Sequence, residues 1–176
     1  IESVVASFQH EKSIELQRLV RGWLRTVSQD TTDVNIYCNP AGDWSLGGFD
    51  ADAGLTGRKI VIDNYGPAIP VGGGAFSGKD PTKVDRSAAY MARKIAVDKI
   101  QTLQKRPGGN EVFVYLAYAI GRKDPVEATI VVNGEESKIT GYDLTPQGII
   151  DYLNLKAPQY LQTASWGHMG TNQTWG

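Results

Sequence analysis

Glycines and cations fall in the same quarter of this sequence. Nine glycines lie between Gly47 and Gly78, and residues 58–94 carry seven basic and three acidic side chains. This segment is therefore +4, which leaves −5 for the rest of a chain whose net charge is −1. Glycine lets backbone N–H groups approach a ligand closely, and Lys and Arg neutralise phosphate oxygens. The combination predicts a site for a polyphosphate.

The sharpest stretch in this segment runs Gly-Gly-Gly-Ala-Phe-Ser-Gly-Lys-Asp over residues 72–80. From Gly73 it is one residue away from the P-loop pattern, in which a Ser or Thr at the place of Asp80 binds Mg²⁺. Pro67 and Pro70 disfavour the buried strand that a P-loop follows. We favour a glycine-rich phosphate loop in another fold over two alternatives, a P-loop NTPase and a structural loop with incidental charge.

Cations continue at helical spacing after this loop. Lys79, Lys83 and Arg86 are four and three residues apart, which predicts a shared face near the start of a helix. Residues 80–81 supply Asp as N-cap and Pro at the first helical position. Because cations there oppose the helix dipole, the arrangement favours a bound anion. Asp85 could ligate Mg²⁺, the usual companion of phosphate, or form a surface ion pair with a lysine.

Three further signals are weaker. Residues 54–59 place two glycines and a hydroxyl before the adjacent cations Arg58 and Lys59. Asp52, just ahead, could hold an amino group or a ribose, or shape a turn. Trp44 could stack on a base or belong to a core. The two histidines have no metal-ligand spacing around them, so we expect both to be structural and expect no zinc site.

The composition limits the class of protein. With 41% hydrophobic and 21% charged residues among 176, the chain resembles a folded domain rather than a disordered segment. Near-zero net charge predicts no nucleic-acid binding, and no apolar run reaches the ~18 residues that cross a membrane. A single cysteine, Cys38, favours a reducing, cytoplasmic setting. Residues 1–6 have no signal-peptide features and resemble a strand entered midway, so we expect a piece of something longer.

Short strands and a few helices must position these residues. Helices are expected over residues 13–27, from Thr82 to about Thr102, and finally from Thr145 to Leu153. Strands are expected at 1–6, 34–38, 44–48, 59–63, 111–120 and 128–132. Turn residues 39–43 predict one hairpin, and Asn133-Gly134 predicts another. Because no βαβ rhythm is seen, we expect an α+β fold of mostly antiparallel sheets packed with helices.

Two runs carry a family resemblance. Residues 52–59 and 72–90 resemble the S-adenosylmethionine synthetases (methionine adenosyltransferases), and the second run is close to a fingerprint of that family. Shorter segments agree with it, namely Gln9-His10, Asn39-Pro40-Ala41-Gly42, Tyr118-Ala119-Ile120-Gly121 and Gly167-His168. The likeness covers essentially the whole chain, but only the C-terminal half of the family's usual length.

The resemblance implies an enzyme that forms S-adenosylmethionine from ATP and L-methionine. The methionine sulfur attacks C5′ of ATP, and the expelled triphosphate is cleaved to pyrophosphate and phosphate, with Mg²⁺ (two per site) and K⁺ as cofactors. The resemblance also implies repeated α/β domains that are discontinuous in sequence. Residues 1–47 would end an N-terminal-type domain, residues 48–86 would belong to the central domain, and residues 87–176 would form the C-terminal domain.

The resemblance further implies roles for individual residues. Arg58, Lys59 and Lys79 would be the catalytic cations on the phosphates, and Asp85 would lie at the metal site. The remaining substrate contacts would be Trp44 on adenine with Asp43 beside it, Asp52 on the methionine amino group or ribose, Ala75 through its backbone, Lys83 on methionine or phosphate, and Ile120 near the adenosyl group. Val71 and residues 50–51 depart from the family's usual His and Met-Gly, but no departure removes a phosphate cation.

The family's N-terminal motifs are missing from this chain. They include a His-Pro-Asp-Lys motif, a second glycine-rich motif with its aspartate, and a nucleotide-binding lysine. We therefore expect a partner polypeptide that carries this half, either from a nicked enzyme or as a separately encoded subunit. The assembled unit would form a dimer or tetramer. The alternative is a non-catalytic nucleotide-binding or regulatory subunit.

Overall fold

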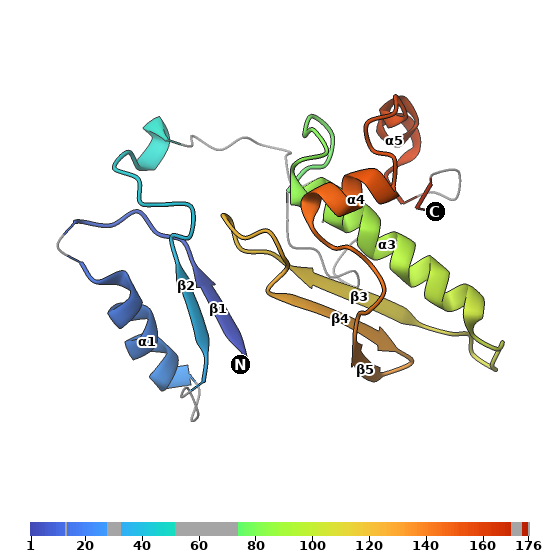
Figure 1. Cartoon of the computed structure of the whole chain (residues 1–176), viewed down its shortest axis with the longest axis horizontal. Coiled ribbons are helices and arrows are strands. Elements are labelled where there is room, and N and C mark those ends of the chain that lie inside the picture. The colour runs from blue at the N-terminus through green and yellow to red at the C-terminus, as the bar shows by residue number, and fades with distance from the viewer. Residues whose placement is uncertain (13, 28–32, 52–73, 170–173, 176) are drawn as a thin grey trace. The chain divides into compact units, whose positions relative to one another are not determined.

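The computed structural model describes residues 1–12, 14–27, 33–51, 74–169 and 174–175 (Figure 1). The chain divides into two compact units. Unit 1 comprises residues 1–56 with 119–122, and unit 2 comprises residues 57–118 with 123–176. The strand expected at 59–63 lies outside the described residues. Among the helices that the structure describes, none has the length and apolar character needed to cross a membrane.

Unit 1 is built on two parallel strands joined through a helix. β1 (Ser3–Ala6) and β2 (Asn35–Cys38) pair in register from Ser3 opposite Asn35 to Ala6 opposite Cys38, and α1 (Leu16–Val27) lies between them in sequence. A parallel pair requires such a crossover connection. A short 3₁₀ turn, η1 (Gly48–Asp50), follows. The strand expected at the N-terminus and the helix expected over 13–27 are confirmed, although the parallel pairing was not expected.

The hairpin predicted around residues 39–43 is wrong. Residues 44–48 form no strand, and β2 pairs with β1 instead. The cause is the side chain of Asn39, whose Nδ2 donates to the Phe8 carbonyl oxygen at 2.9 Å while its Oδ1 accepts from the Phe8 N–H at 2.8 Å. These bonds tie the turn to the end of β1, and no strand follows over residues 44–48.

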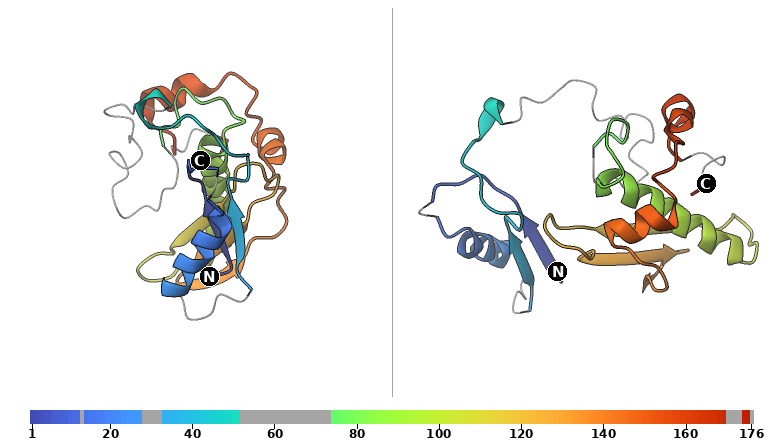
Figure 2. Two further views of the ribbon diagram at one scale, coloured as in Figure 1. Left: turned by 90° about the vertical axis from the view of Figure 1, so that its left-hand side faces the viewer. Right: turned by 45° about the horizontal axis from the view of Figure 1, so that its top comes forward.

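Unit 2 packs helices on a three-stranded antiparallel sheet in the order β3–β4–β5. The strands are β3 (Val112–Ala117), β4 (Glu127–Val132) and β5 (Glu135–Lys138). The helices are α3 (Val84–Thr102), α4 (Pro146–Tyr152) and α5 (Tyr160–Trp166). α3 packs on β3 and against α4, as Figures 1 and 2 show. The α+β class with a mainly antiparallel sheet is confirmed.

Local chemistry explains the elements that were predicted well. The hairpin between β4 and β5 turns at Asn133 and Gly134, whose φ angles of 52° and 91° are those of a type I′ turn. Thr145 caps α4 by accepting from the Gly148 N–H at 3.1 Å, with Pro146 in the first turn. α3 ends at Thr102, as expected.

Two helix predictions need correction. α3 begins at Val84, because the Asp80 carboxylate accepts from the Thr82 N–H at 2.8 Å and so caps a separate turn ahead of the helix. α4 is not the last helix, since α5 follows it. α5 has no side-chain cap at Gln159, so local sequence carried little signal for it. A contact from outside the helix, Arg86 Nη2 donating to Thr163, supports it.

Candidate phosphate-binding site

The loop of residues 74–83 presents two lysines ahead of α3. The Lys79 ammonium donates to the Asp85 carboxylate at 2.6 Å, and the lysine side chain is 22% exposed. Its Nζ lies 3.8 Å from where a Cβ on Gly74 would stand, so the cation lies beside glycine backbone. Gly78 turns the loop with φ 86°, which favours glycine. The structure therefore places a cation, a carboxylate and open backbone together.

Lys83 forms the second ion pair of this loop. Its Nζ lies 3.2 Å from Asp80 Oδ2, and both side chains are more than half exposed. Hydrogen bonds from the Thr82 hydroxyl and then from the Thr82 N–H, followed by the one from Lys83, lower the pKa of Asp80 to about 2. Asp80 is therefore an ionised acceptor where a P-loop would have a hydroxyl, and the helix begins only at Val84. This geometry is not that of a P-loop.

Arg86 does not share an exposed face with these lysines, so that prediction is wrong. Its side chain is 5% exposed. It turns inward because its Nη1 donates to the Lys79 carbonyl oxygen at 2.7 Å and its Nε donates to the Tyr90 hydroxyl at 3.0 Å. Arg86 therefore binds the inner side of the loop, and only Lys79 and Lys83 of the three cations face outward.

A buried aromatic cluster lies behind the loop. Its members are Phe76, Tyr90, His168 and Trp175. Tyr90 stacks on Trp175 with 3.9 Å between ring centres, and Phe76 meets His168 edge-on at 5.0 Å. Sequence reasoning missed this cluster, because its members are scattered along the chain and show no common period. The Gly167-His168 pair was the only signal, and it carried no hint of a contact.

In unit 1, the predicted residues Asp43 and Trp44 follow the turn at Asn39. The pKa of Asp43 is lowered by the hydrogen bond from Asn39 Nδ2 at 2.6 Å and then by His10 Nε2 at 3.3 Å. Trp44 is 41% exposed, so its ring is available rather than enclosed in a core. Asp43 thus lies fixed beside an open indole face.

The segment 119–122 packs against the same turn and carries Ile120. A Cβ on Gly121 would lie 2.5 Å from the Pro40 carbonyl oxygen, and Gly121 has φ 83°, so only glycine fits there. Arg122 lies over the Tyr37 ring at 4.5 Å and adds a second contact to β2. Ile120 remains exposed. Two segments that resemble the family, far apart in sequence, therefore meet in unit 1.

The protein-family model of the S-adenosylmethionine synthetase C-terminal domain matches residues 46–176 of this chain. The chain belongs to the S-adenosylmethionine synthetase family. S-adenosylmethionine synthases from Sulfurovum sp. (strain NBC37-1) and Lacticaseibacillus casei (strain BL23) are 42% and 46% identical to it over 97% of this chain. Those alignments cover 47% and 46% of the relatives, so the chain spans about half the length of the curated relatives it matches.

A solved structure supports the same assignment. The chain is similar to an unusual S-adenosylmethionine synthetase from Campylobacter jejuni, with a TM-score of 0.56 and 27% sequence identity over 99% of this chain. The match covers 50% of that structure's chain. The family resemblance predicted from residues 52–59 and 72–90 is confirmed.

The residues to which the family resemblance assigns roles are distributed over both units. Asp43, Trp44 and Ile120 belong to unit 1, whereas unit 2 carries Ala75, Lys79, Lys83 and Asp85. Within unit 2, the structure brings Lys79 and Asp85 into direct contact. Three predicted site residues, Asp52, Arg58 and Lys59, lie outside the described residues. All of these roles stay predictions.

S-adenosylmethionine synthetases use metal ions, and Asp85 was the predicted ligand. Among the residues described, no three His, Cys, Asp or Glu side chains lie close enough to hold a metal ion. A magnesium ion that also binds phosphates needs only one or two protein carboxylates. Asp85 is half exposed and ionically paired, which fits one such ligand and not a complete site.

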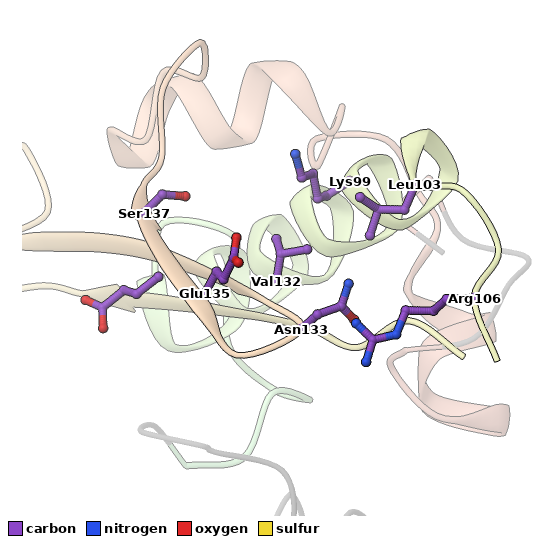
Figure 3. Close-up of a pocket in the computed structure, with 8 residues that line it drawn as sticks. Lys99, Leu103, Arg106, Val132, Asn133, Glu135 and Ser137 are labelled. Carbon is purple, nitrogen blue, oxygen red and sulfur yellow. The ribbon is translucent and has the colours of Figure 1, made fainter. Parts of the chain in front are cut away.

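Unit 2 has an open pocket between the end of α3 and the β4–β5 hairpin, with a volume of about 500 Å³ (Figure 3). Its charged lining is mixed and includes the basic Lys99 and Arg106 and the acidic Glu135 and Glu136. None of the residues assigned to substrate or metal lines this pocket, so the candidate phosphate-binding site is the surface of the loop 74–83.

Proposed function

We propose that this chain is the C-terminal half of an S-adenosylmethionine synthetase. Assembled with a polypeptide that supplies the N-terminal half, it forms S-adenosylmethionine from ATP and L-methionine in the cytoplasm. Family membership supports this reading, and the observation that carries it is the loop 74–83. There two outward lysines are each paired with a carboxylate, and Lys79 lies beside glycine backbone. Such an arrangement suits a triphosphate.

The reaction asks for charge stabilisation rather than proton transfer. The methionine sulfur gives an electron pair to C5′, the C5′–O bond breaks, and that bond's electrons leave on the triphosphate. Sulfur becomes a sulfonium, and water then cleaves the triphosphate to pyrophosphate and phosphate. Preorganised cations aimed at the leaving group lower such a barrier. Lys79 fits this task because its side chain faces outward and is held in place by the ion pair with Asp85, so the cation is positioned before nucleotide binds.

Asp85 has two tasks in this proposal. In the structure it holds the Lys79 ammonium in place through the 2.6 Å ion pair. When nucleotide binds, phosphate oxygens take over Lys79, and the carboxylate is released to serve as one magnesium ligand. Bound Mg²⁺ would supply charge neutralisation at the phosphates. We assign K⁺ no ligand among the described residues.

The partner follows from the incomplete core of unit 1. Among its described residues, the buried apolar ones are few and mostly small, namely Ala6, Val20, Leu24, Val34 and Ala119. The described part of unit 1 has one helix and two parallel strands, although parallel sheets are normally covered on both faces. On α1, Leu19, Trp23 and Val27 recur every fourth residue and are more than half exposed. We infer that the N-terminal half covers this surface, which we call the α1 stripe.

The remaining assignments are part of the same proposal. Residues 1–47 end an N-terminal-type domain, residues 48–86 are part of the central domain, and residues 87–176 form the C-terminal domain. The assembled unit forms a dimer or tetramer. In this proposal, Trp44 contacts adenine and Lys83 contacts methionine or phosphate. The exposure of Trp44 supports its role.

The test is Lys79→Ala in the assembled enzyme. We expect turnover to fall by about 10²-fold or more, the scale of lost electrostatic stabilisation. Lys94→Ala is the matched control. Lys94 and its partner Asp98, 2.5 Å away, both lie on α3, and the Lys94 side chain is about as exposed as that of Lys79, but Lys94 carries no proposed role. The control should keep turnover within about twofold, because such ion pairs contribute little.

Two outcomes would contradict the proposal. S-adenosylmethionine formation by the chain alone would refute the need for the other half. An unchanged maximal rate in the Lys79→Ala assembly would favour the alternative, a non-catalytic regulatory subunit. Intact and native masses of the purified assembly show which polypeptides are present.

A further inference from the structure

The loop 74–83 is anchored on its inner side by buried polar side chains, and the C-terminal segment completes this anchor. We propose that Arg86, Tyr90 and His168 are positioning residues that fix the loop and, with it, the ammonium group of Lys79. None of the three contacts substrate in the proposed function. The inference rests on that function only for the task of Lys79.

Arg86 holds the backbone of the loop. Its Nη1 donates to the Lys79 carbonyl oxygen at 2.7 Å, its Nε to the Tyr90 hydroxyl at 3.0 Å, and its Nη2 to Thr163 Oγ1 at 3.4 Å. The flat face of the guanidinium lies 4.3 Å from the centre of the Tyr160 ring. Each of the three guanidinium nitrogens thus has a hydrogen-bond partner in the protein, and the Tyr160 ring lies against the group. This buried cation therefore binds the loop and not the nucleotide.

Tyr90 and His168 extend the anchor to a loop side chain. The Tyr90 hydroxyl accepts from Arg86 Nε and makes a 2.7 Å hydrogen bond with His168 Nδ1. The other ring nitrogen of His168, Nε2, lies 3.3 Å from Ser77 Oγ in the loop. Burial, followed by the charge of Arg86, lowers the pKa of His168, and a neutral imidazole donates through one ring nitrogen and accepts through the other.

Apolar contacts fix the orientation of these rings. Phe76, the buried residue of the loop, meets His168 edge-on at 5.0 Å and Tyr90 at 5.9 Å. Trp175 stacks on Tyr90, and its indole N–H donates to the His168 carbonyl oxygen at 2.7 Å. The loop is thus anchored through Phe76, Ser77 and the Lys79 carbonyl, while the Lys79 side chain faces outward.

The test compares two Tyr→Phe variants of the full chain, purified with whatever polypeptide accompanies it. Tyr90→Phe removes the hydroxyl between Arg86 and His168 and keeps the stacked ring. Tyr118→Phe is the matched control, since the Tyr118 hydroxyl also makes a 2.7 Å bond in unit 2, to the Leu144 carbonyl oxygen. Tyr90→Phe loses the bonds with Arg86 at 3.0 Å and with His168 at 2.7 Å, whereas Tyr118→Phe loses one bond at 2.7 Å, and only the bonds of Tyr90 belong to the anchor.

Two readouts are taken on each variant: amide hydrogen exchange over residues 74–83, and affinity for inorganic tripolyphosphate by calorimetry. We expect Tyr90→Phe to speed exchange in the loop and to weaken tripolyphosphate binding, each by about 10-fold or more, the effect of losing both buried hydrogen bonds of the Tyr90 hydroxyl. Tyr118→Phe should change neither. If Tyr90→Phe does not fold, Arg86→Lys provides the same readouts, because it keeps the charge and loses the three-way fork.

The readouts separate this inference from the proposed function. Equal exchange in the loop of Tyr90→Phe and Tyr118→Phe would overturn the anchor. Faster exchange with unchanged tripolyphosphate affinity would overturn the positioning of Lys79. A wild-type assembly that bound no tripolyphosphate would instead overturn the proposed function, and the exchange result would still decide whether the anchor exists.

Discussion

Units 1 and 2 differ in how completely they enclose their apolar side chains. In unit 2, helices pack against a sheet and large apolar residues are buried, including Tyr90, Met91, Ile149, Leu153, Leu155 and Trp175. Unit 1 leaves large apolar residues exposed, among them Phe8, Leu19, Trp23, Val27, Leu46 and Phe49. A domain buries its core between packed layers, and one helix on two strands does not provide them.

The proposed phosphate-binding loop and the proposed surface for the other half lie in different units. The loop that carries Lys79 is anchored in the well-enclosed unit, through Phe76 and Arg86. The α1 stripe belongs to the unit whose core is incomplete. In the proposed function, the loop that carries Lys79 and the surface that binds the other half therefore lie in different units, and substitutions should separate their effects.

The largest expected effect comes from the core of unit 2. Trp175→Ala removes a fully buried indole that stacks on Tyr90, and should lower the free energy of unfolding by ~3–5 kcal/mol. Trp23→Ala in unit 1 should change it by only about 0.5 kcal/mol, because that side chain is 57% exposed. Urea unfolding of the full chain measures both. Similar losses of unfolding free energy from the two substitutions would contradict the difference between the cores of units 1 and 2.

A smaller effect is expected when the α1 stripe is made polar. The double substitution Leu19→Ser and Trp23→Ser should weaken association with the N-terminal half by about 10- to 30-fold, since aromatic anchors dominate interface energies. Ile100→Ser alters an exposed apolar residue of unit 2 and is the control. Titration calorimetry with the purified halves measures the affinity. An equal loss in both variants would show that the α1 stripe is not the specific surface.

The smallest expected effect on stability comes from an ion pair in unit 2. Glu127 accepts from Lys138 at 2.6 and 2.7 Å across β4 and β5. This bond, followed by one from Thr129, lowers the pKa of Glu127 from 4.5 to about 2. A lowered folded-state pKa stabilises above pH 4.5, and this contribution is lost as the pH falls toward 2.

Glu127→Gln should therefore reduce stability at pH 6 by less than about 1 kcal/mol, and the difference from wild type should shrink toward pH 2. Urea midpoints between pH 2 and pH 6 measure this difference. A gap that stays constant over this range would show that the charge of Glu127 does not contribute.

The elements predicted correctly depend on neighbours in sequence. Asn133-Gly134 turns the β4–β5 hairpin because both residues accept positive φ, and Thr145 with Pro146 starts α4. Two mistaken elements depended on distant groups. Asn39 bonds to Phe8 rather than shaping a hairpin, and α5 receives its support from Arg86.

The candidate site divides in the same way. Sequence motifs identified the family and named Lys79, Lys83 and Asp85, and the structure shows Lys79 paired with Asp85. Helical spacing also grouped Arg86 with the two lysines, and that grouping was wrong. Spacing alone cannot distinguish a cation that faces solvent from one that turns inward to bond a buried hydroxyl and a backbone carbonyl.

By itself, the sequence determined the family, the glycine-rich loop and the identity of its cations, because these depend on residue type and short spacing. Only the tertiary structure decided which cation faces outward, which strand pairs with β2, and that His168 and Trp175 lie behind the loop. Those outcomes depend on burial and on hydrogen bonds between residues far apart in the chain, and no local pattern encodes where a distant partner will lie.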